Sequence, residues 1–328
     1  MGFFALVLAL LVEHTWPLRR GNRVHAEAGG FAAAIRQAFD GNERRHGMFG
    51  WLVVVGTVLL LVAGIEWLAR SIHPLAVFAL HVLILYWTIG FRQFSQAFAE
   101  IRIALAADDA EGARAVLAGW LRGVNPVEEA IEARRPDVGQ TCRQSIAHAL
   151  LAAHRHVLGP LFCYVVLPAA LGPVLYRMAE MLARHWRRAE PGSQWGEFAD
   201  RAFATIDWIP ARLSAVGFAV VGNFDDALYC WRGASAAGAS TTVQTPPSEP
   251  AVDRTRALLM AVGSGALGVR VADPALERRW AESSRPFECP GGEAQPATLP
   301  LAATLVWRSL LLWLGLYALL TLSDWMGG

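Results

Sequence analysis

The residues best placed to do chemistry lie at the start of an apolar stretch, D-W-I-P-A-R from Asp207 to Arg212, which stays apolar to Gly222. If this stretch enters a bilayer, the carboxylate and the guanidinium lie at or near the headgroups, where a charge costs less than at the bilayer centre. There they could pair with each other or hold a polar ligand. The alternative is a structural pair that caps and anchors a membrane helix, and the residue pattern alone favours this alternative.

The composition is that of an integral membrane protein. Hydrophobic residues make up 54% and charged residues 17% of the 328 positions, whereas soluble domains carry roughly 25% charged residues. All 29 residues counted as lysine or arginine are arginines. The absence of lysine excludes a Walker-type phosphate loop, a Schiff-base lysine and a lysine general base.

Neither the cysteines nor the histidines have the spacing of a metal site. The four cysteines form no C-x-x-C pair, so a zinc knuckle or a dithiol redox motif is not supported, and we interpret them as free thiols. The densest histidine group is His148, His154 and His156. These residues do not share one helical face as an i, i+4 metal pair would, so we predict no metal site.

We expect an all-α polytopic bundle of about four to six membrane segments. The apolar run at 3–12 is about half of the roughly 20 residues that a spanning helix needs, which predicts a short or interfacial helix. The arginine-rich segment 17–47 belongs in the cytoplasm by the positive-inside rule. Spans at 48–69 and 74–91 follow, and the short link between them predicts an antiparallel hairpin. These segments form the N-terminal region, 1–91.

A cytoplasmic layer of amphipathic helices is predicted for 92–156, because apolar residues recur there at helical spacing among many arginines. The next region, 157–223, starts with an apolar stretch that prolines interrupt at positions 160, 168 and 173. Residues 157–183 therefore form either a re-entrant broken helix or a full span paired with 207–222. Such breaks are tolerated where the backbone is buried in protein or lines a cavity.

The region 224–300 is predicted to be cytoplasmic, with a flexible linker at 233–251 and a glycine-spaced helix at 258–270. Its glycines match G-x-G-x-x-G as a string. No strand pattern precedes them, so close helix contact or approach to a ligand is favoured over dinucleotide binding. The last span is 301–322, within a C-terminal region 301–328 whose end we expect to be periplasmic.

Four strings together resemble the CobD/CbiB family of membrane proteins. They are D-D-A-E-G-A-R at 108–114, G-P-L-F at 159–162, D-W-I-P-A-R-L at 207–213 and G-A-L-G-V-R at 265–270. The family includes adenosylcobinamide-phosphate synthases of cobalamin biosynthesis and the AmpE proteins linked to β-lactamase induction. The resemblance extends from about 92 to 270 and implies a multi-pass protein of the bacterial inner membrane.

The chain departs from the synthase pattern mainly at acidic positions. Where synthases carry a Glu-Asn pair and an Asp, this chain has Leu151, Ala152 and Arg155, and where they carry two adjacent acids it has Phe203 and Ala204. The synthase Asp-Ser-Met stretch and an early Gly-Asp-Pro also have no counterpart. Because ATP-dependent amide synthesis needs carboxylates to hold Mg²⁺ against phosphates, the resemblance favours the AmpE branch.

The leading hypothesis is therefore an AmpE-like sensor, accessory or regulatory protein whose degenerate synthase-type pocket binds an unknown ligand. The lipid bilayer and a membrane or cytoplasmic protein are the expected partners, with no nucleic acid. No cofactor is predicted unless the first alternative holds, which is an adenosylcobinamide-phosphate synthase using ATP and Mg²⁺. The other alternative is a transporter or lipid-binding protein. The predicted pocket residues are Asp207, Trp208, Pro210, Arg212, Arg155, Arg270, Gly265, Gly268 and Arg114.

Overall fold

The computed structural model describes residues 2–15, 44–121, 137–167, 170–189, 194–240, 252–272, 274–282 and 286–327. This part of the chain is helical, and its only β-type pairing is an isolated bridge between Val269 and Gly292. The predicted fold class, an all-α membrane protein, is confirmed. Most of the arginine-rich segment 17–47 and the acids Glu128 and Glu129 lie outside the described residues.

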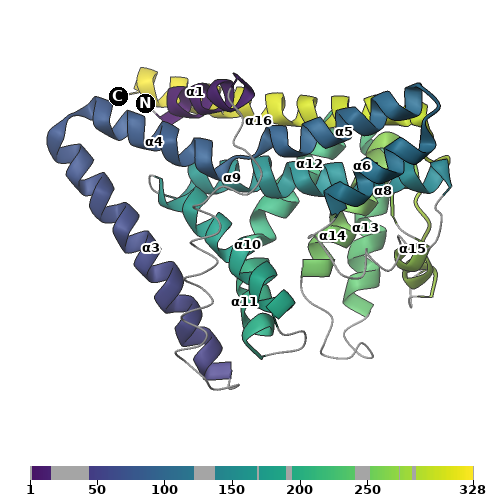
Figure 1. Cartoon of the computed structure of the whole chain (residues 1–328), viewed down its shortest axis with the longest axis horizontal. Helices are drawn as coiled ribbons and strands as arrows, with labels where there is room; N and C mark the ends of the chain where they lie inside the picture. Colours follow the sequence, from purple (N-terminus) through teal and green to yellow (C-terminus); the bar gives the residue numbers. More distant parts are fainter. Residues whose placement is uncertain are drawn as a thin grey trace.

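The N-terminal region forms the predicted helical hairpin. Helix α3 (Arg44–Ile72) and helix α4 (Pro74–Thr88) are joined at His73, whose ring nitrogen accepts a hydrogen bond from the Leu75 amide at 3.2 Å and so caps α4. Helix α1 (Gly2–Thr15) packs along α4. Figure 1 shows α3 running diagonally from its joint with α4, while α1, α4 and α16 lie along one edge. Trp51, Val54 and Val55 of α3 are buried against α10 and α11.

The amphipathic layer begins with helix α5 (Phe91–Ala106) and helix α6 (Ala110–Leu121), which pack against each other as a second hairpin. Asp109 accepts a hydrogen bond from the Gly112 amide at 2.8 Å and so caps α6. An exposed side-chain oxygen in this position satisfies one of the free amides at a helix start. The predicted amphipathic helices in this segment are therefore present.

The centre of the molecule is a long helix that the sequence analysis divided between two regions. Helix α8 (Val138–Ala153) continues through a π-helical turn, η1 (His154–Leu158), into helix α9 (Gly159–Val166). Residues Val138–Val166 are long and apolar enough to cross a membrane, although 78% of the window is buried inside the protein. This helix ends at Val166 and Leu167 has an extended backbone, next to the predicted interruption at Pro168, before helix α10 (Leu171–Ala189). The interruptions predicted at Pro160 and Pro173 are wrong, because both prolines lie in the first turn of a helix.

A bend follows in the stretch that carries the D-W-I-P-A-R string. Helix α11 (Gln194–Ile206) packs on α10 and α3, and helix α12 (Trp208–Val221) departs from it at 50°. The single residue between them is Asp207. Together the two helices could form a broken span or a re-entrant loop. The sequence analysis expected this choice for residues 157–183, whereas the bent pair is at 195–221 and residues 157–166 belong to the Val138–Val166 helix.

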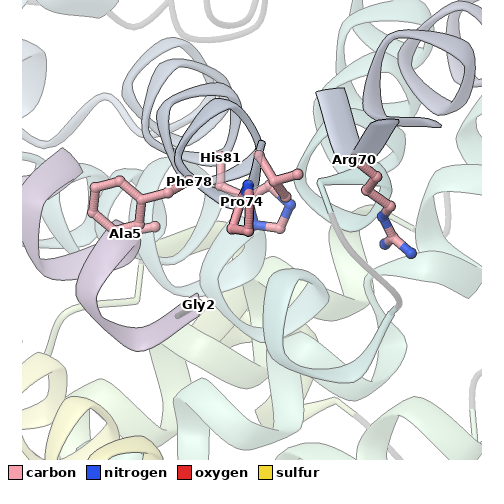
Figure 2. A pocket seen from close by; sticks show the side chains of 7 residues that line it. Gly2, Ala5, Arg70, Pro74, Phe78 and His81 are labelled. Carbon is pink, nitrogen blue, oxygen red and sulfur yellow. The ribbon is translucent and has the colours of Figure 1, made fainter. Parts of the chain in front are cut away.

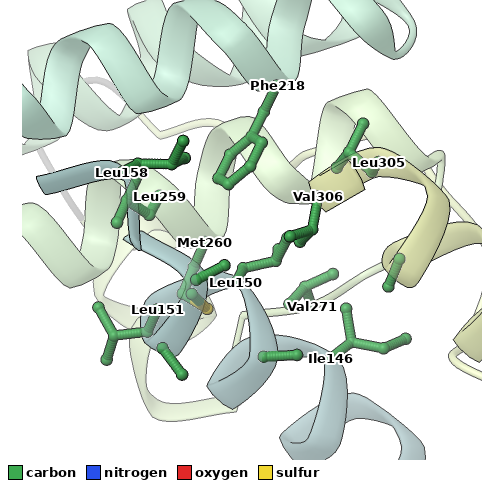
Figure 3. Packing of buried hydrophobic residues seen from close by; sticks show 14 of the residues in the cluster. Ile146, Leu150, Leu151, Leu158, Phe218, Leu259, Met260, Val271, Leu305 and Val306 are labelled. Atoms are coloured by element: carbon green, nitrogen blue, oxygen red, sulfur yellow. The ribbon is translucent and has the colours of Figure 1, made fainter. Parts of the chain in front are cut away.

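The C-terminal part completes the main core. Helix α13 (Phe224–Ser240) packs against helix α14 (Val252–Leu267), followed by helix α15 (Pro274–Ala281), a 3₁₀ turn η3 (Pro296–Thr298) and helix α16 (Leu299–Gly327). Residues 233–240 of the predicted linker 233–251 are helical in α13, which corrects that prediction, and the rest of the predicted linker lies outside the described residues. Figure 3 shows side chains of α8, α12, α14 and α16 meeting in this core, among them Leu150, Phe218, Met260 and Val306.

Two further spans are long and apolar enough to cross a membrane, Gly47–Ile72 and Pro296–Met326. Only 17% and 22% of their windows are buried, so both present apolar side chains that a bilayer would cover. The described residues thus contain three such helices, or four if the bent pair counts as one span. Helices α1 and α4 are apolar but shorter than the helices counted as spans. For this reason the number of spans does not reach the upper end of the predicted range of four to six.

The interpretation of every cysteine as a free thiol is wrong for one pair. Cys230 on α13 and Cys289 are joined by a disulfide between residues 59 positions apart, and Cys142 and Cys163 are free and buried. The sequence contained no signal for this bridge, because its two cysteines are far apart in the chain and become neighbours only when the segment after α15 packs on α13.

Close helix contact explains the glycines of the G-x-G-x-x-G string, as the sequence analysis favoured. A Cβ atom on Gly265 would lie 2.4 Å from the Asp226 carbonyl oxygen, and one on Gly263 would lie 2.5 Å from Leu150 Cδ1. Gly268 has a φ of 63°, which side chains with a Cβ rarely adopt. These glycines bring α14 close to α13 and α8.

We expect Gly265→Ala to destabilise the protein by about 1–3 kcal/mol, because the added methyl group forces α13 and α14 apart. Gly119→Ala is the matched control, since Gly119 is also inside a helix and nothing lies within 4 Å of its added Cβ. Thermal unfolding in detergent should show a lower midpoint for the first variant and an equal or higher one for the second. Equal midpoints for both would contradict the close contact.

Candidate functional site

Asp207 lies at the bend between α11 and α12, and its carboxylate points into the protein. The residue occupies the position before the first residue of α12, yet its side chain makes no capping hydrogen bond. Its side chain is 1% exposed. The predicted role of Asp207 as a helix cap is therefore wrong, because the carboxylate has stronger partners inside the protein.

These partners form a buried polar network of four side chains: Asp207, His154, Tyr176 and Ser214. Asp207 Oδ1 accepts a hydrogen bond from the Tyr176 hydroxyl at 2.7 Å and lies 2.9 Å from His154 Nε2. His154 Nδ1 lies 2.8 Å from the Ser214 hydroxyl. The two nitrogens of one imidazole thus connect the Asp207 carboxyl group to the Ser214 hydroxyl.

The network joins segments that are far apart in the sequence. His154 comes from η1, Tyr176 from α10 and Ser214 from α12, and all three are fully buried. Burial, followed by the Asp207 charge and its hydrogen bond, raises the pKa of the Tyr176 hydroxyl well above its usual value. Tyr176 therefore stays neutral and acts as a donor to the carboxylate.

Gly159 makes room for this arrangement. A Cβ atom at Gly159 would lie 2.3 Å from the Tyr176 ring. This close approach gives a physical reason for the glycine in the G-P-L-F string. The π-helical turn just before it changes the direction in which His154, Arg155 and His156 project, as such turns often do at functional sites.

A group of basic side chains lies beside the network, which we call the arginine cluster and define as Arg155, Arg177 and Arg184. All three positive charges act on the imidazole of His156. Arg177 Nη1 lies 2.7 Å from His156 Nδ1, and its Nε donates to the Thr88 carbonyl at 2.5 Å. The positive charge of Arg155 also acts on the Tyr176 hydroxyl, so the arginine cluster lies next to the buried network.

One carboxylate, that of Glu180, pairs with two of the three arginines. Its Oε2 lies 3.8 Å from Arg177 Nη1 and 3.1 Å from Arg184 Nη2. Burial, with Arg184 acting in the same direction and Glu180 opposing it, lowers the pKa of Arg177. Arg155 has a buried Nε without a hydrogen-bond partner. A partly buried site with surplus positive charge and an unpaired donor favours an anionic ligand.

One position where the sequence departs from the synthase pattern lies at this site. Phe203 packs edge-on against the Tyr176 ring, with centroids 5.4 Å apart. Leu151 and Ala152 are buried on α8, one turn before Arg155, and belong to the main hydrophobic core, whereas Phe203 and Tyr176 belong to a second cluster.

Trp208, Pro210 and Arg212 lie on the other side of the bend. The Arg212 guanidinium stacks over the Trp208 ring at 3.8 Å and donates to the Trp208 carbonyl at 3.1 Å. Trp208 is 54% exposed, whereas Pro210 is buried. Asp207 and Arg212 therefore do not form the ion pair that the sequence suggested, because their side chains point in opposite directions.

The other predicted pocket residues lie in two separate places. Arg270 follows α14 and pairs with Glu288 at 3.5 Å, beside Gly268, whose carbonyl accepts from the Gly292 amide. Arg114 pairs with Glu111 on α6 at 3.2 Å. Neither arginine makes a hydrogen bond or ion pair with the network among the described residues. A ligand role for them and for Gly265 stays a prediction.

Sequence reasoning missed His154, Tyr176, Ser214 and Arg177 as site residues. The available signal was their polarity within apolar stretches, since buried polar side chains need partners. Their spacing along the chain could not show which of them meet, because three different helices supply them.

The site suits an anion better than a metal ion. The described residues contain no group of three or more His, Cys, Asp or Glu side chains that could hold a metal. Mg²⁺ needs oxygen ligands, and arginines cannot supply them. The residues present therefore fit a phosphate or carboxylate group, and they do not fit a Mg²⁺ ion held by the protein alone.

Comparison with known proteins supports the family resemblance that the four sequence strings suggested. The model of the family described as CobD/Cbib protein matches residues 3–306. The chain belongs to the CobD/CbiB family. It is 28% identical to "Cobalamin biosynthesis protein CobD" of Stutzerimonas stutzeri over 95% of both chains. No solved structure matches.

Two further relatives cover somewhat less of the chain. "Cobalamin biosynthesis protein CobD" of Chromobacterium violaceum is 30% identical over 74% of this chain and 71% of that protein. "Protein AmpE" of Shigella flexneri is 24% identical over 70% of this chain and 78% of that protein. Both named branches of the CobD/CbiB family are thus similar to this chain, and the match to the CobD proteins is stronger.

We expect Tyr176→Phe to lower stability by about 1–3 kcal/mol, because the Asp207 carboxylate loses a charge-assisted hydrogen bond while remaining buried. The matched control is Tyr229→Phe, because Tyr229 is 53% exposed on α13. Thermal unfolding in detergent checks both variants. If they unfold at the same temperature, the hydroxyl of Tyr176 does not stabilise the buried carboxylate.

Proposed function

We propose that this chain acts in cobalamin biosynthesis as a CobD-type membrane protein that binds an anionic group at the arginine cluster. The observation that carries the proposal is the similarity to the Stutzerimonas stutzeri CobD protein over 95% of both chains. The family match over residues 3–306 includes every element that supplies the site, namely η1, α10, α11 and α12. The AmpE relative is less similar and covers less of the chain.

The reaction that the family resemblance implies joins a carboxyl group of adenosylcobyric acid to an aminopropanol-type amine. In our proposal, Arg155, Arg177 and Arg184 orient an anionic part of the substrates by charge-assisted hydrogen bonds. The buried network beside them fixes the α11–α12 bend and so the positions of these arginines. ATP and Mg²⁺ would supply the activation of the carboxyl group, and we assign no described residue to that step.

A second candidate is an AmpE-like accessory or regulatory role at the same membrane. Two observations favour it: Phe203, at a position that the resemblance gives as acidic in synthases, packs on Tyr176 of the buried network, and the described residues contain no metal-binding group of three or more His, Cys, Asp or Glu side chains. In this role the arginine cluster would bind an anionic ligand without chemistry. The multi-pass bacterial inner-membrane location, with cytoplasmic main loops and a periplasmic C-terminus, is proposed for either function.

Complementation separates the two functions. We expect the chain to restore growth of a bacterial strain that lacks its own adenosylcobinamide-phosphate synthase on a medium where growth requires cobalamin synthesis. A tagged copy must be detected in the membrane fraction. A well-expressed chain that gives no growth would contradict the cobalamin proposal. Restored β-lactamase induction in a strain lacking AmpE would then support the second candidate.

Arg155→Gln should lower the growth rate in this assay, because an anionic ligand loses a charged donor. We expect its apparent affinity to fall on the order of tenfold, the equivalent of about 1.5 kcal/mol. Arg212→Gln is the matched control, since Arg212 stacks on Trp208 away from the cluster. Equal growth with the two variants would show that the arginine cluster is not the binding site.

A further inference from the structure

His156 lies in the π-helical turn η1, and its partly buried imidazole contacts the arginine cluster. Its Nδ1 lies 2.7 Å from Arg177 Nη1. A guanidinium only donates hydrogen bonds, so His156 Nδ1 accepts this one and carries no proton. The imidazole that holds Arg177 is therefore neutral, with its proton on Nε2.

The surroundings of His156 show what a neutral ring contributes here. The ionisable groups that act on its ring include Arg177, Arg184, His148 and Arg155, which are all basic. A proton on Nδ1 would remove the acceptor and would add another positive charge beside these groups. A carboxylate in the same place would accept the hydrogen bond but would cancel one positive charge. The neutral imidazole orients Arg177 and leaves its charge intact.

Arg177 has a second anchor at the end of α4. Its Nε donates to the carbonyl of Thr88, the last residue of α4, at 2.5 Å, and a positive charge is favourable at a helix C-terminus. The backbone carbonyl of His156 accepts from the Gly90 amide at 3.1 Å, so His156 and Arg177 together hold the link after α4. Because Nε and Nη1 are engaged, the Nη2 end of Arg177 is left for an anion, and the side chain is 15% exposed.

The charge balance distinguishes this site from another place where an arginine and a histidine meet a glutamate. At the arginine cluster, Glu180 is shared by two of three arginines, which leaves a surplus of positive charge. A cavity of about 270 Å³ near the start of α4 is lined by Arg70 and His81 (Figure 2). There the single arginine pairs with Glu66 at 2.6 Å, and His81 Nε2 also lies 3.6 Å from that carboxylate. That cavity has no surplus charge for an anion, whereas the cluster has one.

We propose that His156 is a positioning residue of the anion site, whose neutral imidazole orients Arg177 so that its Nη2 end binds the anionic group. This inference rests on the proposed function of the arginine cluster and names the residue on which the geometry of the cluster depends. His156 acts through Arg177 and does not contact the ligand. The position requires an acceptor without charge.

Calorimetric titration of the purified protein in detergent with inorganic phosphate tests this role. His156→Leu should raise the dissociation constant about tenfold, as expected when one charge-assisted donor is lost. His156→Asn should bind phosphate like the wild type, because its Oδ1 is an acceptor as many bonds from the backbone as Nδ1. His73→Leu is the matched control, since His73 Nδ1 also accepts a hydrogen bond, at the opposite end of α4.

A second titration shows whether His156 acts through Arg177. In the Arg177→Gln background, His156→Leu should change the dissociation constant less than about twofold, because the side chain that it positions is gone. The same tenfold loss in that background would overturn the positioning role. Equally weak binding by His156→Asn and His156→Leu, with both variants folded, would also overturn it.

Two results separate this inference from the proposed function. If His156→Leu binds phosphate like the wild type while Arg155→Gln binds it more weakly, the anion site stands and the role of His156 is wrong. If the wild type does not bind phosphate, or binds it no better than Arg155→Gln does, the anion site itself is wrong and the inference fails with it. The unfolding midpoint of each variant shows whether a lost signal reflects misfolding.

Discussion

The burial of the Asp207 carboxylate is the constraint on which the arrangement of the site depends. A carboxylate with 1% exposure is stable only when its partners replace water, and here they are His154 and Tyr176. Because these partners come from η1 and α10, the charge connects three segments at the bend between α11 and α12. Removing one partner would leave the carboxylate buried with too few donors, so the segments must move together.

This constraint also places the arginine cluster. Arg155 follows His154 in the π-helical turn, and Arg177 follows Tyr176 on α10, so two of the four network residues have a basic neighbour in the chain. Because His154 and Tyr176 are bonded to Asp207, the backbone positions from which Arg155 and Arg177 project are fixed as well. The negative charge is inside and the positive charges are beside it.

The sequence predicted the architecture better than the site. Apolar runs and prolines predicted the α3–α4 hairpin, the break near residue 168 and the glycine contacts of α14, because each depends on local pattern. The predicted ion pair between Asp207 and Arg212 does not form. Asp207 lies before the first residue of α12 and bonds His154, whereas Arg212 lies inside the helix and stacks on Trp208. The π-helical turn and the Cys230–Cys289 bridge depend on packing between distant segments, which one sequence does not reveal.

The central claim is that Asp207 and His154 stabilise the protein as a pair, and a double-mutant cycle measures this most directly. The free energies of unfolding of Asp207→Asn, His154→Gln and the double variant are compared with that of the wild type. The account predicts a coupling energy of about 1–3 kcal/mol, as for residues that share one buried network. Additive effects, with a coupling energy near zero, would contradict it.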